Sequence, residues 1–321
     1  MLKTIKGEIS LPKENGYQNS LIIGIDIGGT YFRIGAVDLF GKVLDYKMDL
    51  SQKISLSHGA VDALANIISE YIKKFNENKI LMISIGFPST ISKDRRVVYQ
   101  TPNLSGFDNI RVPELLEERL HIPVVIDRDV NHLLLYEMNL HRIPKEDISL
   151  GIFFGSGIGN SLYFNGDFWR GKHGVACEAG HFHLLGKNDK CGCGNTGCME
   201  RYAAGRRLGE IAETIFPNPK INDLFIEYAS NELLIEFVQI MCVLIVAELN
   251  IFDPDYLILG GGILNMPGFP LNLLKDEIQA HVRKPYPGND YITIFANGKP
   301  ENGILGAAYS VLRMPEYGSM L

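Results

Sequence analysis

The sequence has no long hydrophobic run and no excess of positive charge. Its longest uniformly apolar stretch, residues 240–247, is 8 residues long, whereas a membrane-spanning helix needs roughly 20. The first residues lack the apolar centre of a secretion signal. Lysine and arginine number 31 against 37 acidic residues, a net charge of −6, which does not favour a general nucleic-acid binder. We therefore expect a cytoplasmic protein that binds neither membranes nor nucleic acid.

Cysteine is also scarce, with five residues in 321, and three of the five lie between positions 191 and 198. That spacing is too tight for a disulfide framework and suits metal binding in a reducing compartment. One histidine lies shortly before them, and one histidine with three cysteines makes a closed four-coordinate set that fits structural Zn²⁺. The alternative is a group of reduced, buried thiols. The predicted ligands are His181, Cys191, Cys193 and Cys198.

The remaining cysteines and a second histidine are not expected to bind this metal. If residues 181–183 form a strand, His183 points to the opposite side from His181, because strand side chains alternate. Cys177 and Cys242 are expected to be ordinary buried cysteines.

Two common nucleotide-binding fingerprints are missing. No Gly-Lys pair is followed by Ser or Thr, so there is no P-loop, and Asn160 replaces the last glycine of a dinucleotide fingerprint. Three other glycine turns follow predicted strands, at 26–30, 155–159 and 260–262. A single such turn is more often a structural hairpin, but three of them favour phosphate binding. Asp26 could hold Mg²⁺ through water, and Thr30 could bond a phosphate oxygen.

Apolar periodicity predicts two similar runs of strands and helices. Each run opens with a strand, a glycine turn and a hairpin, and continues with alternating helices and strands. The predicted strands are 21–27, 31–39, 42–48, 79–87, 124–126, 148–154, 160–164, 256–259 and 292–295. The predicted helices are 57–75 with Ser57 as N-cap, 112–120, 130–141, 206–215, 222–229, 232–252, 271–282 and 304–312. The pattern predicts two α/β halves that present their glycine turns to a shared cleft.

This organisation predicts an N-terminal appendage over residues 1–20 and two α/β domains. The N-terminal domain covers 21–129, and we expect the last helix, 303–312, to return to it. The C-terminal domain covers 130–302 and carries the zinc loop, 181–198.

Taken together, these motifs resemble the ROK family of repressors, sugar kinases and uncharacterised reading frames. The resemblance rests on the 26–30 and 155–159 turns, on Glu-Ala-Gly-His at 178–181, and on the cysteine loop through Glu200, and it covers residues 21–312. It implies the actin/hexokinase-like (ribonuclease H-like) duplicated fold, with two α/β domains around a cleft. It also implies transfer of phosphate from ATP to a sugar hydroxyl, with Mg²⁺, and a homodimer, which is common in the family.

Within the family the chain most resembles the D-allose kinases, through segments 86–88, 92–94, 101–104, 128–131 and 252–262. This resemblance implies conversion of D-allose to D-allose 6-phosphate. The alternatives are a glucokinase, fructokinase or N-acetylmannosamine kinase of the same family, or a non-catalytic sugar sensor. Family repressors carry a helix-turn-helix module of roughly 60 residues ahead of the kinase-like part. The residues before Leu21 show no helical period, so we expect a kinase rather than a repressor.

The resemblance also assigns roles to individual residues. Asp129 matches the catalytic base, for which the alternatives are an N-cap of the following helix and the neighbouring Asp127 as the active carboxylate. The positions that match sugar contacts are Asn103, Arg128, Asp129, Glu178, His181 and Glu200. The positions that match the ATP and phosphate side are Asp26, Gly28, Gly29, Thr30, Gly155, Ser156, Gly157, Gly260 and Gly261.

Three positions depart from the common family pattern. Arg128 stands where many family glucokinases have Asn, and either contacts the sugar or pairs with Asp127 or a phosphate. Cys177 stands where Gly is usual. Tyr31 stands where Lys is frequent, which leaves Arg33 as the candidate cation on the phosphate side.

Overall fold

The structure is a computed structural model that describes residues 19–55, 59–101, 104–215 and 220–315. Ser57 and Asn103, and all but the end of the expected 1–20 appendage, lie outside the described residues. The chain divides into two compact units. The first comprises the described parts of Met1–Ser89, Arg95–His132 and Glu301–Leu321, and the second comprises those of Thr90–Asp94 and Leu133–Pro300.

A five-stranded mixed sheet forms the centre of the first unit, with the order β3-β2-β1-β4-β7. Its strands are β1 (Ser20–Ile27), β2 (Tyr31–Asp38), β3 (Val43–Leu50), β4 (Lys79–Phe87) and β7 (Val124–Arg128). The unit also contains α1 (Gln52–Ser55), α2 (Ala60–Ile72), the 3₁₀ turn Lys73–Phe75, β6 (Val98–Gln100), α3 (Val112–Leu120) and α10 (Asn302–Leu312). The hairpin strands run antiparallel to β1, whereas β4 and β7 run parallel to it.

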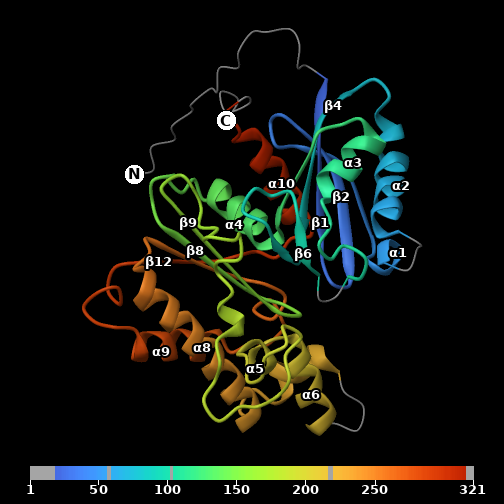
Figure 1. The fold of residues 1–321 in the computed structure, drawn as a ribbon. Helices are drawn as coiled ribbons and strands as arrows, with labels where there is room; N and C mark the ends of the chain where they lie inside the picture. Colours follow the sequence, from blue (N-terminus) through green and yellow to red (C-terminus); the bar gives the residue numbers. More distant parts are fainter. Residues whose placement is uncertain (1–18, 56–58, 102–103, 216–219, 316–321) are drawn as a thin grey trace. The chain divides into compact units, whose positions relative to one another are not determined.

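Helices cover both faces of this first sheet, α10 on one side and α2 on the other (Figure 1). The apolar run of β1 is buried on both faces, as a strand covered by helices on each side requires. Ile22 packs with the buried side chains of α10. The α10 residue Ile304 lies directly over Gly24 and Gly35, where added Cβ atoms would come within 2.9 and 2.8 Å of its Cγ2. The last helix therefore completes a core that begins with the first strand.

The second unit repeats this arrangement, with the sheet order β10-β9-β8-β11-β12. Its strands are β8 (Ser149–Phe154), β9 (Ile158–Phe164), β10 (Asp167–Phe168), β11 (Tyr256–Gly260) and β12 (Ile292–Phe295), and the short β5 (Thr90–Ile91) belongs to the same unit. Again the hairpin strands β8, β9 and β10 pair antiparallel, whereas β11 and β12 run parallel to β8. The helix α4 (Asp129–Leu140) begins in the first unit and ends in the second.

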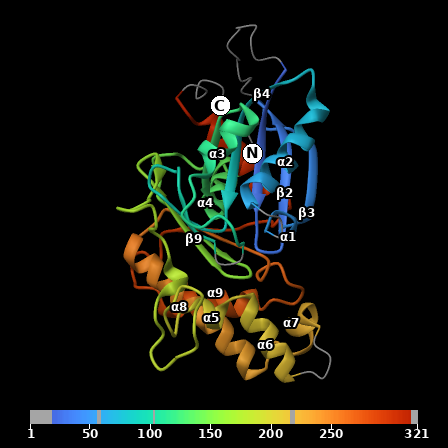
Figure 2. The same ribbon diagram turned by 45° about the vertical axis from the view of Figure 1, so that its right-hand side comes forward.

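The helices of the second unit are α5 (Glu200–Ala203), α6 (Gly205–Ile215), α7 (Leu224–Glu227), α8 (Glu232–Phe252) and α9 (Leu271–His281), with 3₁₀ turns at Ala179–His181 and Ile221–Asp223. The single helix predicted over 222–229 is thus a 3₁₀ turn followed by the four-residue α7. Helices α8 and α9 lie side by side (Figures 1 and 2), and Gln239 Nε2 donates to Glu277 Oε1 between them at 3.3 Å.

The 21-residue α8 is the most apolar helix of the described chain. By length and composition it could cross a membrane, with a mean hydropathy of 2.1 over its 18-residue window. More than half of that window is buried, and its inward side chains form the core of the second unit with β8 and β11. Core helices of globular domains pass the same test of length and composition, and the packing of α8 is that of a core helix.

One carboxyl group is buried on α8 among these apolar side chains. Glu248 is 3% exposed, and its side chain hydrogen-bonds with Asn160 of β9. Burial raises the pKa of Glu248 to about 7. Its Oε2 and the Asn160 Oδ1 are both buried acceptors without a hydrogen-bond partner among the described residues. Protonation would give the Glu248 carboxyl a hydrogen-bond donor of its own.

Candidate functional site

The first glycine turn lies at the end of β1, in the first unit. Asp26 Oδ2 accepts a 3.1 Å hydrogen bond from Arg33 Nη1 on β2. The turn is closed by the Gly28 amide, which donates to the Tyr31 carbonyl at 2.9 Å, and Thr30 is exposed beside it. Arg33, the candidate cation on the phosphate side, is therefore paired with the carboxylate of the same turn.

Asp26 also packs against the first turn of α10. A Cβ on Gly303 would come within 2.5 Å of Asp26 Cγ, so only glycine fits there. Burial raises the pKa of the Asp26 carboxyl, and the Arg33 guanidinium acts in the opposite direction. Burial is the larger effect, and the ion pair with Arg33 offsets part of it at a carboxyl that could hold a cation through water.

Asp129 lies at the junction between β7 and α4. It is the first residue of the helix, and its Oδ1 accepts a 2.8 Å hydrogen bond from the Val130 amide. Gly86 of the adjacent β4 lies beside it, where an added Cβ would come within 3.1 Å of Asp129 Cα. Because β1, β4 and β7 are parallel neighbours, Asp26 and Asp129 both lie toward the carboxyl ends of these strands. Ligands of open α/β sheets bind at that edge.

The neighbouring Asp127 holds this junction together. Its Oδ1 accepts hydrogen bonds from the Arg128 amide at 2.8 Å and from Asn131 Nδ2 at 2.6 Å, and its Oδ2 lies 3.9 Å from Arg95 Nη1. Asp127 and Arg128 are 5% and 9% exposed. These contacts tie the Asp127 carboxylate to the junction itself. Sequence reasoning did not single out Arg95, whose left-handed φ of 58° is not signalled by its residue type.

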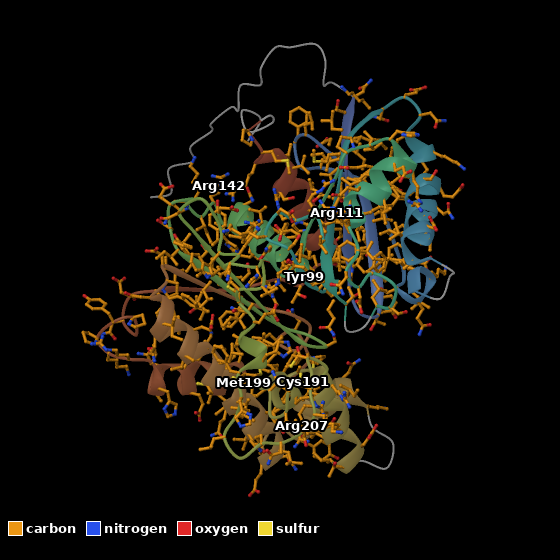
Figure 3. The ribbon with its side chains drawn as sticks, in the orientation of Figure 1. Tyr99, Arg111, Arg142, Cys191, Met199 and Arg207 are labelled. Atoms are coloured by element: carbon orange, nitrogen blue, oxygen red, sulfur yellow. The ribbon has the colours of Figure 1, made fainter. Side chains whose placement is uncertain are left out.

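The four predicted metal ligands come together in the second unit. Their donor atoms all lie within 4.8 Å of one another. Cys193 Sγ and Cys198 Sγ are 3.6 Å apart, as are Cys191 Sγ and His181 Nδ1. A tetrahedral zinc ion with Zn–S bonds of ~2.3 Å places its sulfurs ~3.8 Å apart, so the donor set and its spacing fit Zn²⁺. Cys191 and the nearby Met199 are labelled in Figure 3.

The second ring nitrogen of His181 contacts Glu178, one of the residues predicted to bind sugar. Its Nε2 lies 3.5 Å from Glu178 Oε2, so the imidazole connects the cysteines to a carboxylate, an arrangement that orients metal-bound histidines. Burial raises the pKa of the Cys191 thiol, and it raises that of Cys198 to about 12. A bound cation would displace these protons, so metal affinity should increase with pH.

Two expectations near this cluster were wrong. Residues 179–181 form a 3₁₀ turn rather than a strand, so the alternation argument for His183 does not apply. His183 is not among the clustered donor residues, but it braces the loop, since its Nδ1 lies 3.0 Å from the Thr196 carbonyl oxygen. Cys177 is half-buried rather than buried and has a left-handed φ of 63°, the conformation that glycine adopts most easily. Cys242 is buried, as expected.

The second glycine turn joins β8 to β9, and Glu200 of α5 packs against it. Glu200 Oε2 accepts a 2.9 Å hydrogen bond from the Ile158 amide. The third turn follows β11, the parallel neighbour of β8, and Gly261 there approaches the Phe154 carbonyl so closely that a Cβ would lie 2.2 Å from its oxygen. The structure thus brings the 155–157 and 260–261 glycines to one edge of the second sheet.

Comparison with protein-family models matches residues 22–314 to the ROK family. The chain belongs to the ROK family. One curated relative of this ROK protein is the glucokinase of Thermotoga maritima, 22% identical over 311 residues that cover 89% of this chain and 96% of the glucokinase. Another is the xylose repressor of Bacillus subtilis, 26% identical over 288 residues that cover 87% of this chain and 72% of the repressor.

Among solved structures, the ROK hexokinase from Thermus thermophilus superposes on this ROK protein with a TM-score of 0.73. The two chains are 27% identical, and the match covers 91% of this chain and 99% of the hexokinase. The predicted fold class, an actin/hexokinase-like duplicated α/β fold, is confirmed.

Proposed function

We propose that this ROK protein is an ATP-dependent hexose kinase in which Asp129 is the general base. The observation that carries the proposal is the position of this carboxylate between β7 and α4, at the strand edge that also bears Asp26. Family relatives that are named glucokinase and hexokinase support it.

In the proposed reaction, Asp129 accepts the proton of the sugar 6-hydroxyl while O6 attacks the γ-phosphorus of ATP. The bond between O6 and phosphorus forms, the bond from phosphorus to the bridging oxygen of ADP breaks, and ADP leaves. Positioning and charge stabilisation supply most of the remaining catalysis in phosphoryl transfer. When bound, Mg²⁺ would neutralise developing phosphate charge.

The proposed phosphate contacts are the amides of the glycine turns. Asp26 is the carboxylate that would hold the hydrated Mg²⁺, and the exposed Thr30 would donate to a phosphate oxygen. The backbone contacts are assigned to Gly28, Gly29, Gly155, Ser156, Gly157, Gly260 and Gly261.

The proposed sugar contacts are Asn103, Arg128, Glu178, His181 and Glu200. His181 would orient Glu178 through their 3.5 Å contact and would itself be held by the structural zinc ion. Carboxylates accept two hydroxyls at once, which suits the vicinal diols of a hexose.

We further propose D-allose as the preferred hexose. Allose and glucose differ only in configuration at C3, so selection needs a polar group that one epimer leaves unpaired, which is costly when the group is buried. Arg128 is 9% exposed and lies next to the base. Its guanidinium offers only donors, unlike the amide that many glucokinases of the family have at this position.

The decisive experiment is a coupled assay of ADP release. It compares kcat/KM for D-allose, D-glucose, D-fructose, D-mannose and N-acetylmannosamine under one set of conditions. Allose should have the highest value. A higher value for glucose or fructose would overturn the allose assignment and leave the hexose kinase standing, whereas sugar binding without ADP release from any hexose would favour a sugar sensor.

A further inference from the structure

The backbone amide of Ile158, the first residue of β9, is hydrogen-bonded by a side chain that comes from outside the β8–β9 turn. The Ile158 amide donates to Glu200 Oε2 at 2.9 Å, and Glu200 belongs to α5, which follows the cysteine loop. Gly157 passes so close that a Cβ there would come within 2.5 Å of the same oxygen. The carboxylate and the turn therefore pack directly against each other.

The sheet does not provide this anchor. Phe154 is the strand partner of Ile158. Gly155 and Gly157 form the hydrogen-bonded pair next to them, and because such pairs alternate along an antiparallel ladder, Phe154 and Ile158 do not exchange hydrogen bonds. The rest of the turn is closed by the Gly155 amide, which donates to the Gly157 carbonyl at 2.9 Å, and by the Gly205 amide, which donates to the Gly155 carbonyl at 2.8 Å. The conformation around Ile158 thus depends on a carboxylate supplied by another element.

The two oxygens of this carboxylate have different surroundings. Oε2 is bound to the turn, while Oε1 makes no hydrogen bond within the described residues and lies 3.8 Å from the position of a Cβ on Gly157. A hydrogen bond to an ionised carboxylate is stronger than one between neutral groups. One side chain could therefore hold the turn and accept a ligand hydroxyl at the same time.

We propose that Glu200 is a positioning residue for the nucleotide side of the site. Through Oε2 it fixes the 155–159 turn in the conformation that receives phosphate, and through Oε1 it accepts a sugar hydroxyl. This inference rests on the proposed kinase function. Because coupling between two ligands is reciprocal, sugar that immobilises Glu200 should also tighten nucleotide binding.

Amide hydrogen exchange of Ile158 in the ligand-free protein tests the contact itself. Glu200→Ala should speed exchange of this amide by about tenfold or more, since a charge-assisted hydrogen bond is lost. Glu200→Gln keeps an acceptor oxygen and should stay within about threefold of wild type. Unchanged exchange in Glu200→Ala would overturn the proposal.

Two alanine substitutions within the turn provide a matched pair that leaves Glu200 intact. Gly157→Ala should displace the carboxylate and reproduce the fast exchange. Gly155→Ala should not, because the nearest atom to its Cβ is the Gly157 carbonyl oxygen at 4.0 Å. Equal exchange in the two variants would contradict the inferred role of the contact, even if Glu200→Ala failed to fold.

Binding of Mg²⁺ and a non-hydrolysable ATP analogue, measured by calorimetry without sugar, tests the consequence. Glu200→Ala should weaken this binding by about tenfold, while Glu213→Ala, on the exposed side of α6, should bind as wild type does. Wild-type affinity in Glu200→Ala would overturn the inference alone. If wild-type protein bound no nucleotide, the proposed function itself would fail.

Discussion

Asp129 offers the most direct test at the scale of a single residue. Asp129→Asn keeps the size of the side chain and an acceptor oxygen for the Val130 amide, but it cannot take a proton. We expect kcat for the preferred hexose to fall ~10²–10⁴-fold, the usual contribution of a general base. Steady-state kinetics measures this loss.

Sugar affinity by calorimetry and the melting temperature serve as controls for Asp129→Asn, and both should stay close to wild type. Turnover within about tenfold of wild type would mean that another group is the base.

Glu248 gives the residue-scale prediction for pH. Its pKa of about 7 in the folded protein lies above the ordinary value of 4.5, so between these values the folded state holds the proton more tightly than the unfolded state. The free energy of unfolding should therefore fall as pH rises from about 4.5 to 7 and level off above. Glu248→Gln, which cannot ionise, should stabilise the protein at pH 8 by about 3 kcal/mol.

Urea unfolding at pH 5 and pH 8 checks this expectation, and the benefit of Glu248→Gln should be larger at pH 8. Glu213→Gln, on the exposed side of α6, is the matched control and should change little at either pH. A benefit that does not depend on pH would mean that burial does not suppress ionisation of Glu248.

The sequence was informative at the residue scale where chemistry and spacing act together. Three cysteines within eight positions, with His181 just before them, predicted a cluster that the structure brings within 4.8 Å. The Arg33–Asp26 pair was not predictable, because strand register, not spacing, brings these two side chains together. The contact between Glu200 and the Ile158 amide likewise depends on tertiary packing.

At the scale of elements, the loop 181–198 should depend on its metal. We expect one zinc ion per chain in protein purified without chelators, measured by elemental analysis. Cys193→Ala should lose the zinc and melt at lower temperature, since such sites contribute on the order of 10 kcal/mol of apparent binding energy. Protein that contains no zinc would contradict the assignment.

Cys177→Gly is the matched control for that variant. It also removes a thiol close to the loop, but its position has the left-handed φ of 63° that glycine tolerates. It should keep its zinc and its melting temperature. Loss of zinc in Cys177→Gly would mean that the ligand set differs from the four residues proposed.

Long elements were predicted well, whereas the shortest helical elements were missed. The strand 79–87 and the helix 232–252 have the predicted bounds because each has a long apolar pattern between clear stop signals. The 3₁₀ turn at Ala179–His181 and the helix α5 are only three and four residues long, too short for any period to emerge. The alternation argument for His183 assumed a strand in place of this 3₁₀ turn, and it failed for that reason.

At the scale of the whole molecule, α10 is the element that closes the first unit. Ile304 is fully buried against Gly24 and Gly35. Ile304→Ala should therefore lower the free energy of unfolding by about 2–4 kcal/mol, as other large-to-small core changes do. Urea unfolding measures the loss, and Leu305→Ala, at the half-buried next position, should cost less. An equal loss at both positions would contradict this account of the core.

The duplicated architecture was visible in the sequence as a repeated order of elements, and both sheets have the same arrangement of antiparallel and parallel strands. The order of the strands within each sheet was not visible in the sequence, because it depends on which strands pair across long stretches of chain. The neighbours of β1 are β2, which follows it directly, and β4, which begins about 50 residues further on.

The position of α10 also has a consequence for how the protein is made. Chains emerge from the ribosome amino-terminus first, and domains generally fold as units. Here the helix that covers Ile22 of β1 is synthesised only after Leu133–Pro300. One apolar face of the nascent first sheet therefore stays uncovered while the main segment of the second unit, Leu133–Pro300, is made in one stretch and acquires its own core. Folding in the cell would begin in the second half of the chain and end in the first.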